Sequence, residues 1–316
     1  MFIRCNLVKL QFDADATTVQ AASLNFRDLQ IVRGEYMFPT SPNVVPASDG
    51  AGVVEAVGKK VTRFQAGDKV MVNFIQSFLH SPVAAEMILS AVGGSVDGTL
   101  REYGVYNEQG LVTMPSNLTF LEAATLNCAG ITAWNSLYGI AGRSVAPGDW
   151  VLTQGTGGVS LFALQFAKAA GARVIATTSS AGKADRLKQL GADHVLNYRE
   201  DASWGETANK ITGGKGVQHV IEVTGGPTMR QSLNAIAPEG VISMIGFRGG
   251  MAGDDSPGFA DAMAKGAITR GVLVGSRQQF EAMIRSVEGN DIKPVVDEKV
   301  FNLDQVKEAY QVCPIM

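Results

Sequence analysis

Hydrophobic and polar positions alternate in two different ways along the chain. From Trp150 onward, short apolar runs recur, and good helix formers such as Lys183–Leu190 and Met229–Ala237 lie between them. The runs that we interpret as strands are 150–152, 173–177, 194–197, 219–223, 241–245 and 271–274. Strands that alternate with helices in this way predict an α/β fold with a doubly wound, six-stranded parallel sheet.

The residues before about 118 have a different pattern. Their apolar stretches are shorter, turn residues are frequent, and glycines interrupt the segments 48–58 and 64–72. Glycines inside strands mark bends or places where two backbones approach closely. The first part of the chain is therefore predicted to be a small, mostly β lobe, and a length of 316 residues is consistent with two domains.

The turn after the first predicted strand of the α/β part is rich in glycine. It reads Gly155-Thr156-Gly157-Gly158-Val159, and apolar residues then follow at helical spacing as far as Ala170. A strand, a glycine turn and a helix begin a dinucleotide-binding unit, in which backbone N–H groups and the helix N-terminus hold a pyrophosphate. Gly225 and Gly246 follow two further strands, although for these two ordinary loop formation is an equally good interpretation.

The end of the second predicted strand indicates which nicotinamide cofactor would bind. NAD sites usually have an acidic residue there, which accepts hydrogen bonds from the ribose hydroxyls. Residues 177–183 contain no carboxylate but do contain Ser179, Ser180 and Lys183, while Arg186 and Tyr198 follow nearby. Hydroxyl donors and a cation suit a 2′-phosphate, so the sequence favours NADPH over NADH. The alternative is that the two basic residues are solvated on a surface helix.

Composition and charge exclude several classes of protein. Hydrophobic residues make up 46% of the chain, and the formal net charge is −3 without a basic block, which argues against nucleic acid as a partner. No apolar run is long enough to span a membrane, and the N-terminal residues do not resemble a secretory signal. The three cysteines, Cys5, Cys128 and Cys313, are scattered and odd in number, which is typical of a reducing compartment. We therefore expect a cytoplasmic protein.

Several motifs together resemble the medium-chain dehydrogenase/reductase superfamily, in particular its zinc-independent, quinone-oxidoreductase-like group. They are the segments 23–28, 48–58, 64–70, 128–134, 155–159, 191–198 and 274–277. The resemblance implies a GroES-like catalytic lobe at 1–118, a Rossmann NADPH-binding domain at 119–274, and a return to the catalytic lobe at 275–316. It also implies a homodimer.

The positions that hold zinc in the zinc-dependent members of the superfamily are changed here. The first cysteine ligand is replaced by Asn25, and the His-Glu pair is replaced by Ser48-Asp49. Cys128 stands where another cysteine ligand would be, and residues 74–100 lack the cysteines of the family's structural zinc loop. Asp28 and Asp49 could supply oxygen ligands, but structural carboxylates are a simpler interpretation. We predict that the protein holds no metal.

Without a metal, hydrogen-bond donors must stabilise the oxygen that gains charge when hydride arrives. The resemblance implies Asn25 and Thr132 as donors and Tyr36 as a weaker third, while Asp28 would orient Asn25 or the ribose, or relay a proton. Each of Asn25, Asp28 and Thr132 could equally be a turn or cap residue. Cys128 is more simply a small buried residue than a nucleophile.

The resemblance also implies contacts with the cofactor. Those at the phosphates and ribose are Gly155, Thr156, Gly157, Gly158, Val159, Ser179, Ser180, Lys183 and Tyr198, and those near the nicotinamide are Thr224, Gly246, Phe247, Gly275 and Arg277. Arg277 could meet a phosphate or be a solvated side chain at the start of a helix.

The expected reaction is NADPH-dependent hydride transfer, without a metal, to a quinone or an α,β-unsaturated carbonyl compound. We expect the substrate to be apolar. Two alternatives remain open: an alcohol dehydrogenase or carbonyl reductase of the same superfamily, and a protein that binds NADPH without turnover. Compared with the family, both ends look short, since Met1–Thr18 matches the usual opening strands poorly and no closing strand follows Val306–Tyr310. If the ends are short, the β lobe is expected to lack edge strands.

Overall fold

The computed structural model describes residues 2–4, 15–247, 249–250 and 257–312. The chain divides into two compact units: Met1–Ile131 with Gly275–Met316 form unit 1, and Thr132–Val274 form unit 2. In this division residues 119–131 group with unit 1, whereas the sequence assigns them to the nucleotide-binding domain. The boundary after residue 118 remains a prediction.

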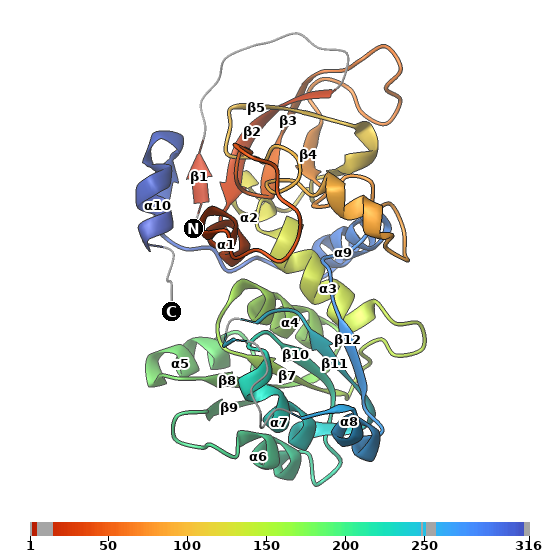
Figure 1. Cartoon of the computed structure of the whole chain (residues 1–316), viewed down its shortest axis with the longest axis vertical. Coiled ribbons are helices and arrows are strands. Elements are labelled where there is room, and N and C mark those ends of the chain that lie inside the picture. The colour runs from red at the N-terminus through yellow and green to blue at the C-terminus, as the bar shows by residue number, and fades with distance from the viewer. Residues whose placement is uncertain (1, 5–14, 248, 251–256, 313–316) are drawn as a thin grey trace. The chain divides into compact units, whose positions relative to one another are not determined.

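Unit 2 contains the predicted parallel sheet (Figure 1). Its strands are β7 (Trp150–Gln154), β8 (Arg173–Thr178), β9 (His194–Asn197), β10 (Val217–Glu222), β11 (Ile236–Met244) and β12 (Ile268–Gly271). Their order is β12-β11-β10-β7-β8-β9, and every neighbouring pair is parallel. This is the doubly wound Rossmann arrangement, with the strand order reversing beside β7, so the predicted fold class is confirmed.

Two strand boundaries in unit 2 differ from the prediction. The last strand lies at Ile268–Gly271 rather than at 271–274, and Val274 has a φ of +38°, a value that a β-branched residue in a strand does not adopt. Strand β11 begins at Ile236, so the preceding helix ends earlier than the helix formers predict. In both cases tertiary pairing with neighbouring strands decides the boundary, and local propensity does not.

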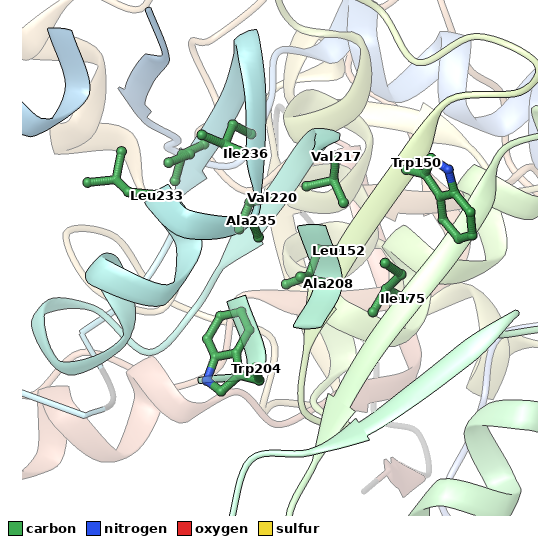
Figure 2. Packing of buried hydrophobic residues seen from close by; sticks show 11 residues of the cluster. Trp150, Leu152, Ile175, Trp204, Ala208, Val217, Val220, Leu233, Ala235 and Ile236 are labelled. Carbon is green, nitrogen blue, oxygen red and sulfur yellow. The ribbon is translucent and has the colours of Figure 1, made fainter. Parts of the chain in front are cut away.

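One buried apolar cluster of unit 2 lies between the sheet and two of its helices. The helices of this part of the chain are α3 (Ile131–Tyr138), α4 (Gly158–Ala169), α5 (Ala181–Gln189), α6 (Trp204–Ile211), α7 (Gly226–Ala235) and α8 (Phe259–Lys265). Figure 2 shows Leu152 and Val220 of the central strands packing with Trp204 of α6 and Leu233 of α7. This apolar layer holds β7 and β10 side by side, and both strands end at the predicted cofactor turns.

Unit 1 is built on a mostly antiparallel sheet, as predicted for the first lobe. Its strands are β1 (Phe2–Arg4), β2 (Asp15–Ser23), β3 (Asp49–Ala56), β4 (Lys69–Val72), β5 (Tyr103–Tyr106), β6 (Leu111–Thr113) and β13 (Val300–Asn302). The order is β13-β1-β2-β3-β4-β6, and β5 also pairs with β2. At Gly52 an added Cβ would lie 2.0 Å from the carbonyl oxygen of Thr18, so the glycine allows β2 and β3 to approach closely.

The expectation that the lobe lacks an edge strand at its N-terminal side is wrong. Strand β1 pairs antiparallel with β2 and parallel with β13, with Phe2 opposite both Ser23 and Val300. The sequence pattern missed this strand because only three residues form it, too few for a periodicity to be recognised.

The remaining elements of unit 1 are short helices. They are α1 (Phe26–Arg33), α2 (Phe120–Ala123), α9 (Arg277–Gly289) and α10 (Val306–Val312), a π-helical turn η3 (Leu126–Gly130), and 3₁₀ turns η1 (Ala85–Ser90), η2 (Glu108–Gly110) and η4 (Leu303–Gln305). Helix α1 has Asn25 as its N-cap, whose backbone N–H donates to the carboxylate of Asp28 at 2.8 Å, and Gly34 as its C-cap, with a φ of +70°. Among the described residues, no helix has both the length and the apolar character needed to cross a membrane.

Candidate functional site

The glycine turn between β7 and α4 has open space beside two of its glycines. Gly155 has a φ of +71°, and a Cβ added at Gly155 or Gly157 would meet no atom of the described residues within 4 Å. Gly157 is the N-cap of α4, and no side chain caps the helix there. The turn at the N-terminus of α4 is therefore open at two glycines, and it is here that we predict the pyrophosphate to bind.

The end of β8 brings the predicted 2′-phosphate residues to the same edge of the sheet. The backbone N–H of Gly155 donates to the carbonyl oxygen of Thr177 at 2.9 Å, which joins the glycine turn to β8. Ser180 is the N-cap of α5 and accepts from the backbone N–H of Lys183, whose side chain is exposed. Tyr198 follows β9, and its N–H donates to Thr178 at 3.0 Å. The structure thus brings Ser179, Ser180, Lys183 and Tyr198 together.

The turns after β10 and β11 lie next to each other at this edge. Gly225 has a φ of +99°, and a Cβ added to it would lie 3.1 Å from the Cα of Phe247. The N–H of Gly249 donates to the carbonyl oxygen of Thr224 at 2.7 Å. The side chain of Phe247 is 47% exposed, so a large apolar ring is available beside these turns. The predicted nicotinamide contacts Thr224, Gly246 and Phe247 are therefore neighbours.

In unit 1, two of the four predicted catalytic residues, Asp28 and Tyr36, contact a buried arginine. Arg27 is 7% exposed, lies 3.7 Å from the carboxylate of Asp28, and donates from Nε to the hydroxyl of Tyr36 at 3.2 Å. Its guanidinium also lies over the rings of Tyr36 and Phe74, at 4.9 and 4.5 Å from their centroids. Sequence reasoning did not select Arg27, because a single Arg beside an Asp is usually a solvated pair.

Burial changes the acidity of the carboxyl groups near Arg27. Burial raises the pKa of Asp28 to about 6, although the charge of Arg27 and the N–H of Asn25 oppose the change. Burial raises the pKa of Asp49 to about 7, and the polar side chains of Asn25 and Ser48 oppose this change. The hydroxyl of Ser48 donates to this carboxylate at 2.9 Å. Asn25 and the two carboxyl groups thus lie within one cluster.

The pKa values of one phenol, Tyr36, and one thiol, Cys128, are also raised in this cluster. Burial raises the pKa of Tyr36, against the charge of Arg27, and burial raises the pKa of the Cys128 thiol well above its usual value. A thiol of raised pKa is a poor nucleophile. The Cys128 side chain is partly exposed, and its interpretation as a small structural residue remains a prediction.

The other predicted site residues have partners in their own units. Thr132 lies in α3 of unit 2, is 4% exposed, and its carbonyl oxygen accepts from the Ser136 hydroxyl at 2.7 Å. Arg277 begins α9 of unit 1, donates to Gln109 and lies 3.4 Å from Glu281. Gly275, also in unit 1, approaches Ile131 so closely that an added Cβ would lie 2.6 Å from it. Their contacts with a cofactor or substrate remain predictions.

Among the described residues, no group of three or more His, Cys, Asp or Glu side chains could hold a metal ion. The carboxyl groups of Asp28 and Asp49 instead have the cationic Arg27 beside them. Cys5 and Cys313 lie outside the described residues.

Sequence reasoning missed one more group, in unit 2. Glu222 at the end of β10 is fully buried, and its carboxylate accepts a hydrogen bond from Gln154 at the end of β7. A lone carboxylate inside the apolar run His219–Val223 was the signal that could have identified it. Gln154 gives no such signal, because a glutamine before a turn is ordinary.

Comparisons with known proteins agree with this two-unit arrangement. The model of the alcohol dehydrogenase GroES-like domain matches residues 17–116, and that of the zinc-binding dehydrogenases matches residues 158–289. A zinc-type alcohol dehydrogenase-like protein of Schizosaccharomyces pombe is 47% identical over 295 residues, which are 93% of this chain and 85% of that protein.

The names of two further relatives indicate two different activities. A crystal structure from Sinorhizobium meliloti, described as an alcohol dehydrogenase, has a TM-score of 0.87 and 39% identity, covering 96% of this chain and 89% of that one. The quinone oxidoreductase of Pongo abelii is 28% identical over 93% of this chain and 83% of its own length. The chain therefore belongs to the medium-chain dehydrogenase/reductase superfamily, whose members are oxidoreductases that bind a nicotinamide cofactor.

Proposed function

We propose that this protein is an NADPH-dependent reductase that transfers hydride to a quinone or an α,β-unsaturated carbonyl compound without a metal. The observation that carries the choice of cofactor is the end of β8. Residues 177–183 present the hydroxyls of Ser179 and Ser180 and the exposed ammonium of Lys183, and they contain no carboxylate. A 2′-phosphate would be held by these donors, whereas the ribose of NADH would lack its usual acidic partner.

The residues of each unit suggest a division of roles. Bound NADPH would supply the hydride, with its phosphates at the Gly155 turn and its nicotinamide beside Thr224, Gly246 and Phe247. The substrate carbon that accepts the hydride gains an electron pair, and the charge passes to the substrate oxygen. Asn25 and Thr132, with Tyr36 as a third donor, would stabilise that oxygen, and solvent would supply the proton.

A delocalised substrate suits this set of residues. Quinones and enones spread the new charge over several atoms, so they need less help from an acid than simple ketones. The fixed positive charge near the proposed donors belongs to Arg27, which lies beside Asp28 and Tyr36. Phe247, 47% exposed, supports an apolar substrate.

A second candidate is an alcohol dehydrogenase or carbonyl reductase. The names of the Schizosaccharomyces pombe and Sinorhizobium meliloti relatives favour it. Stoichiometric zinc in the purified protein, or reduction of NADP⁺ that depends on an added alcohol, would support this second candidate over the first.

The family resemblance also suggests a homodimer. The molar mass of the purified protein in solution tests this.

The test is a titration of the purified protein with NADPH and with NADH, followed by nicotinamide fluorescence. 1,2-Naphthoquinone and an enone are then added, and loss of absorbance at the nicotinamide band is measured. Tight NADPH binding with rapid oxidation is the expected result. Binding without oxidation of any electrophile would instead indicate a protein that binds NADPH without turnover.

A further inference from the structure

The carboxylate of Glu222 is held entirely by hydrogen-bond donors. Its side chain is 0% exposed at the end of β10. One oxygen, Oε1, accepts from the backbone N–H groups of Thr224 and Gly225, each at 3.0 Å, and from the hydroxyl of Thr228 at 2.7 Å. These three donors all belong to the turn between β10 and α7 or to the first residues of α7.

The second oxygen faces a different part of the sheet. Oε2 accepts from the side-chain amide of Gln154 at 2.6 Å and from the hydroxyl of Ser232 in α7. The amide oxygen of Gln154 in turn accepts from the backbone N–H of Val223 at 3.2 Å. One carboxylate and one amide therefore join the carboxyl ends of β7 and β10 to the beginning of α7.

A buried charge of this kind is costly unless hydrogen bonds replace the lost water. Glu222 is the only Asp, Glu, Lys or Arg side chain that is buried among the described residues of unit 2, and no cation of those residues forms an ion pair with it. Five donors face its two oxygens. A glutamine in its place would keep one acceptor oxygen but direct an amide NH₂ at the donors of Gln154 and Ser232, so a carboxylate fits the site better.

The position of this network connects it with the cofactor turns. Gln154 directly precedes Gly155, where the phosphates are expected, and Thr224, expected near the nicotinamide, donates its own N–H to Glu222. We propose that Glu222 is a positioning residue that fixes the turns after β7 and β10 in the geometry that receives the cofactor. The proposal rests on the proposed nicotinamide site, but the rigidity of the two turns can be measured without any ligand.

The test compares Glu222→Gln with a control in the same strand. Val217 begins β10, is 0% exposed and packs in the core, far along the strand from the turns. Val217→Ala is expected to lower the melting temperature without changing the turns. In Glu222→Gln we expect faster hydrogen–deuterium exchange in residues 155–158 and 223–228 of the protein without cofactor. We also expect about tenfold weaker NADPH binding, from the loss of hydrogen bonds to a charged group.

The outcomes separate the positioning role from the cofactor assignment. Equal exchange in the two turns of wild type and Glu222→Gln would overturn the proposal, whether or not NADPH binds. The same weakening of NADPH binding in Val217→Ala would also overturn it, since general destabilisation would then explain the effect. If the wild type bound no NADPH while exchange in Glu222→Gln rose as expected, the cofactor assignment would fail and the positioning of the turns would stand.

Discussion

Arg27 shows how much a single residue changes the interpretation of unit 1. The sequence presents it as one of an ordinary pair of charged residues, but the structure buries it between Asp28, Tyr36 and Phe74. Its Nη1 also donates to the carbonyl oxygen of Val92 at 3.1 Å. These partners lie up to 65 positions away in the sequence, and no local pattern could associate them. The predicted donors Asn25 and Tyr36 were selected by resemblance, not by geometry.

Replacing Arg27 with methionine should strongly destabilise the protein. Asp28 would keep its buried position without a cation, and breaking a buried pair in this way costs about 3–5 kcal/mol. Chemical denaturation of Arg27→Met, Asp28→Asn and the double variant measures this cost. The double variant should be more stable than Arg27→Met, because the carboxylate of the Arg27–Asp28 ion pair is then removed together with its cation. Arg33→Met, on the exposed end of the same helix, should change the stability by less than about 0.5 kcal/mol.

At the scale of elements, the sequence predicted the helices and strands whose formation depends on residues close together in the chain. The β7–turn–α4 unit was predicted because a buried strand, a glycine turn in which Gly155 has a positive φ, and an amphipathic helix are all encoded within about twenty residues. The position of β12 was predicted wrongly, because its bounds depend on pairing with β11. The five hydrogen-bond donors around Glu222 could not be predicted from the sequence either, because β7, β10 and α7 come together only in the folded unit.

The β8–α5 connection carries the prediction of cofactor preference. Lys183→Glu should weaken NADPH binding by about tenfold to a hundredfold and leave NADH binding nearly unchanged, because only the 2′-phosphate would meet the reversed charge. Fluorescence titration with both cofactors measures this. Lys188→Glu is the matched control, since Lys188 is exposed in the last turn of the same helix. An equal loss for NADPH and NADH in Lys183→Glu would show that Lys183 does not select the phosphate.

At the scale of the whole molecule, the two units contain buried titratable groups that respond to pH in opposite directions. In unit 1 burial raises the pKa of Asp28 and Asp49 to about 6 and about 7. In unit 2 burial lowers the pKa of His219 to about 4, with Asp149 opposing the change and Arg270 adding to it. An acid with a raised pKa stabilises the fold at low pH, and this contribution is lost as the pH rises through the folded value. A histidine with a lowered pKa stabilises the fold above pH 6.5, and this contribution is lost as the pH falls.

Unit 1 should therefore become more stable, and unit 2 less stable, as the pH falls from 7 to 5. For His219 the loss is about 2 kcal/mol, or roughly 4–8 °C in the melting temperature of unit 2. All three tryptophans, Trp134, Trp150 and Trp204, lie in unit 2, so their fluorescence reports the unfolding of that unit alone. His219→Gln should make the tryptophan midpoint nearly independent of pH in this range. Asp49→Asn should leave that midpoint as in the wild type, because it removes part of the opposite response of unit 1 and changes nothing in unit 2. A tryptophan midpoint that rises on acidification would contradict the burial of a neutral His219.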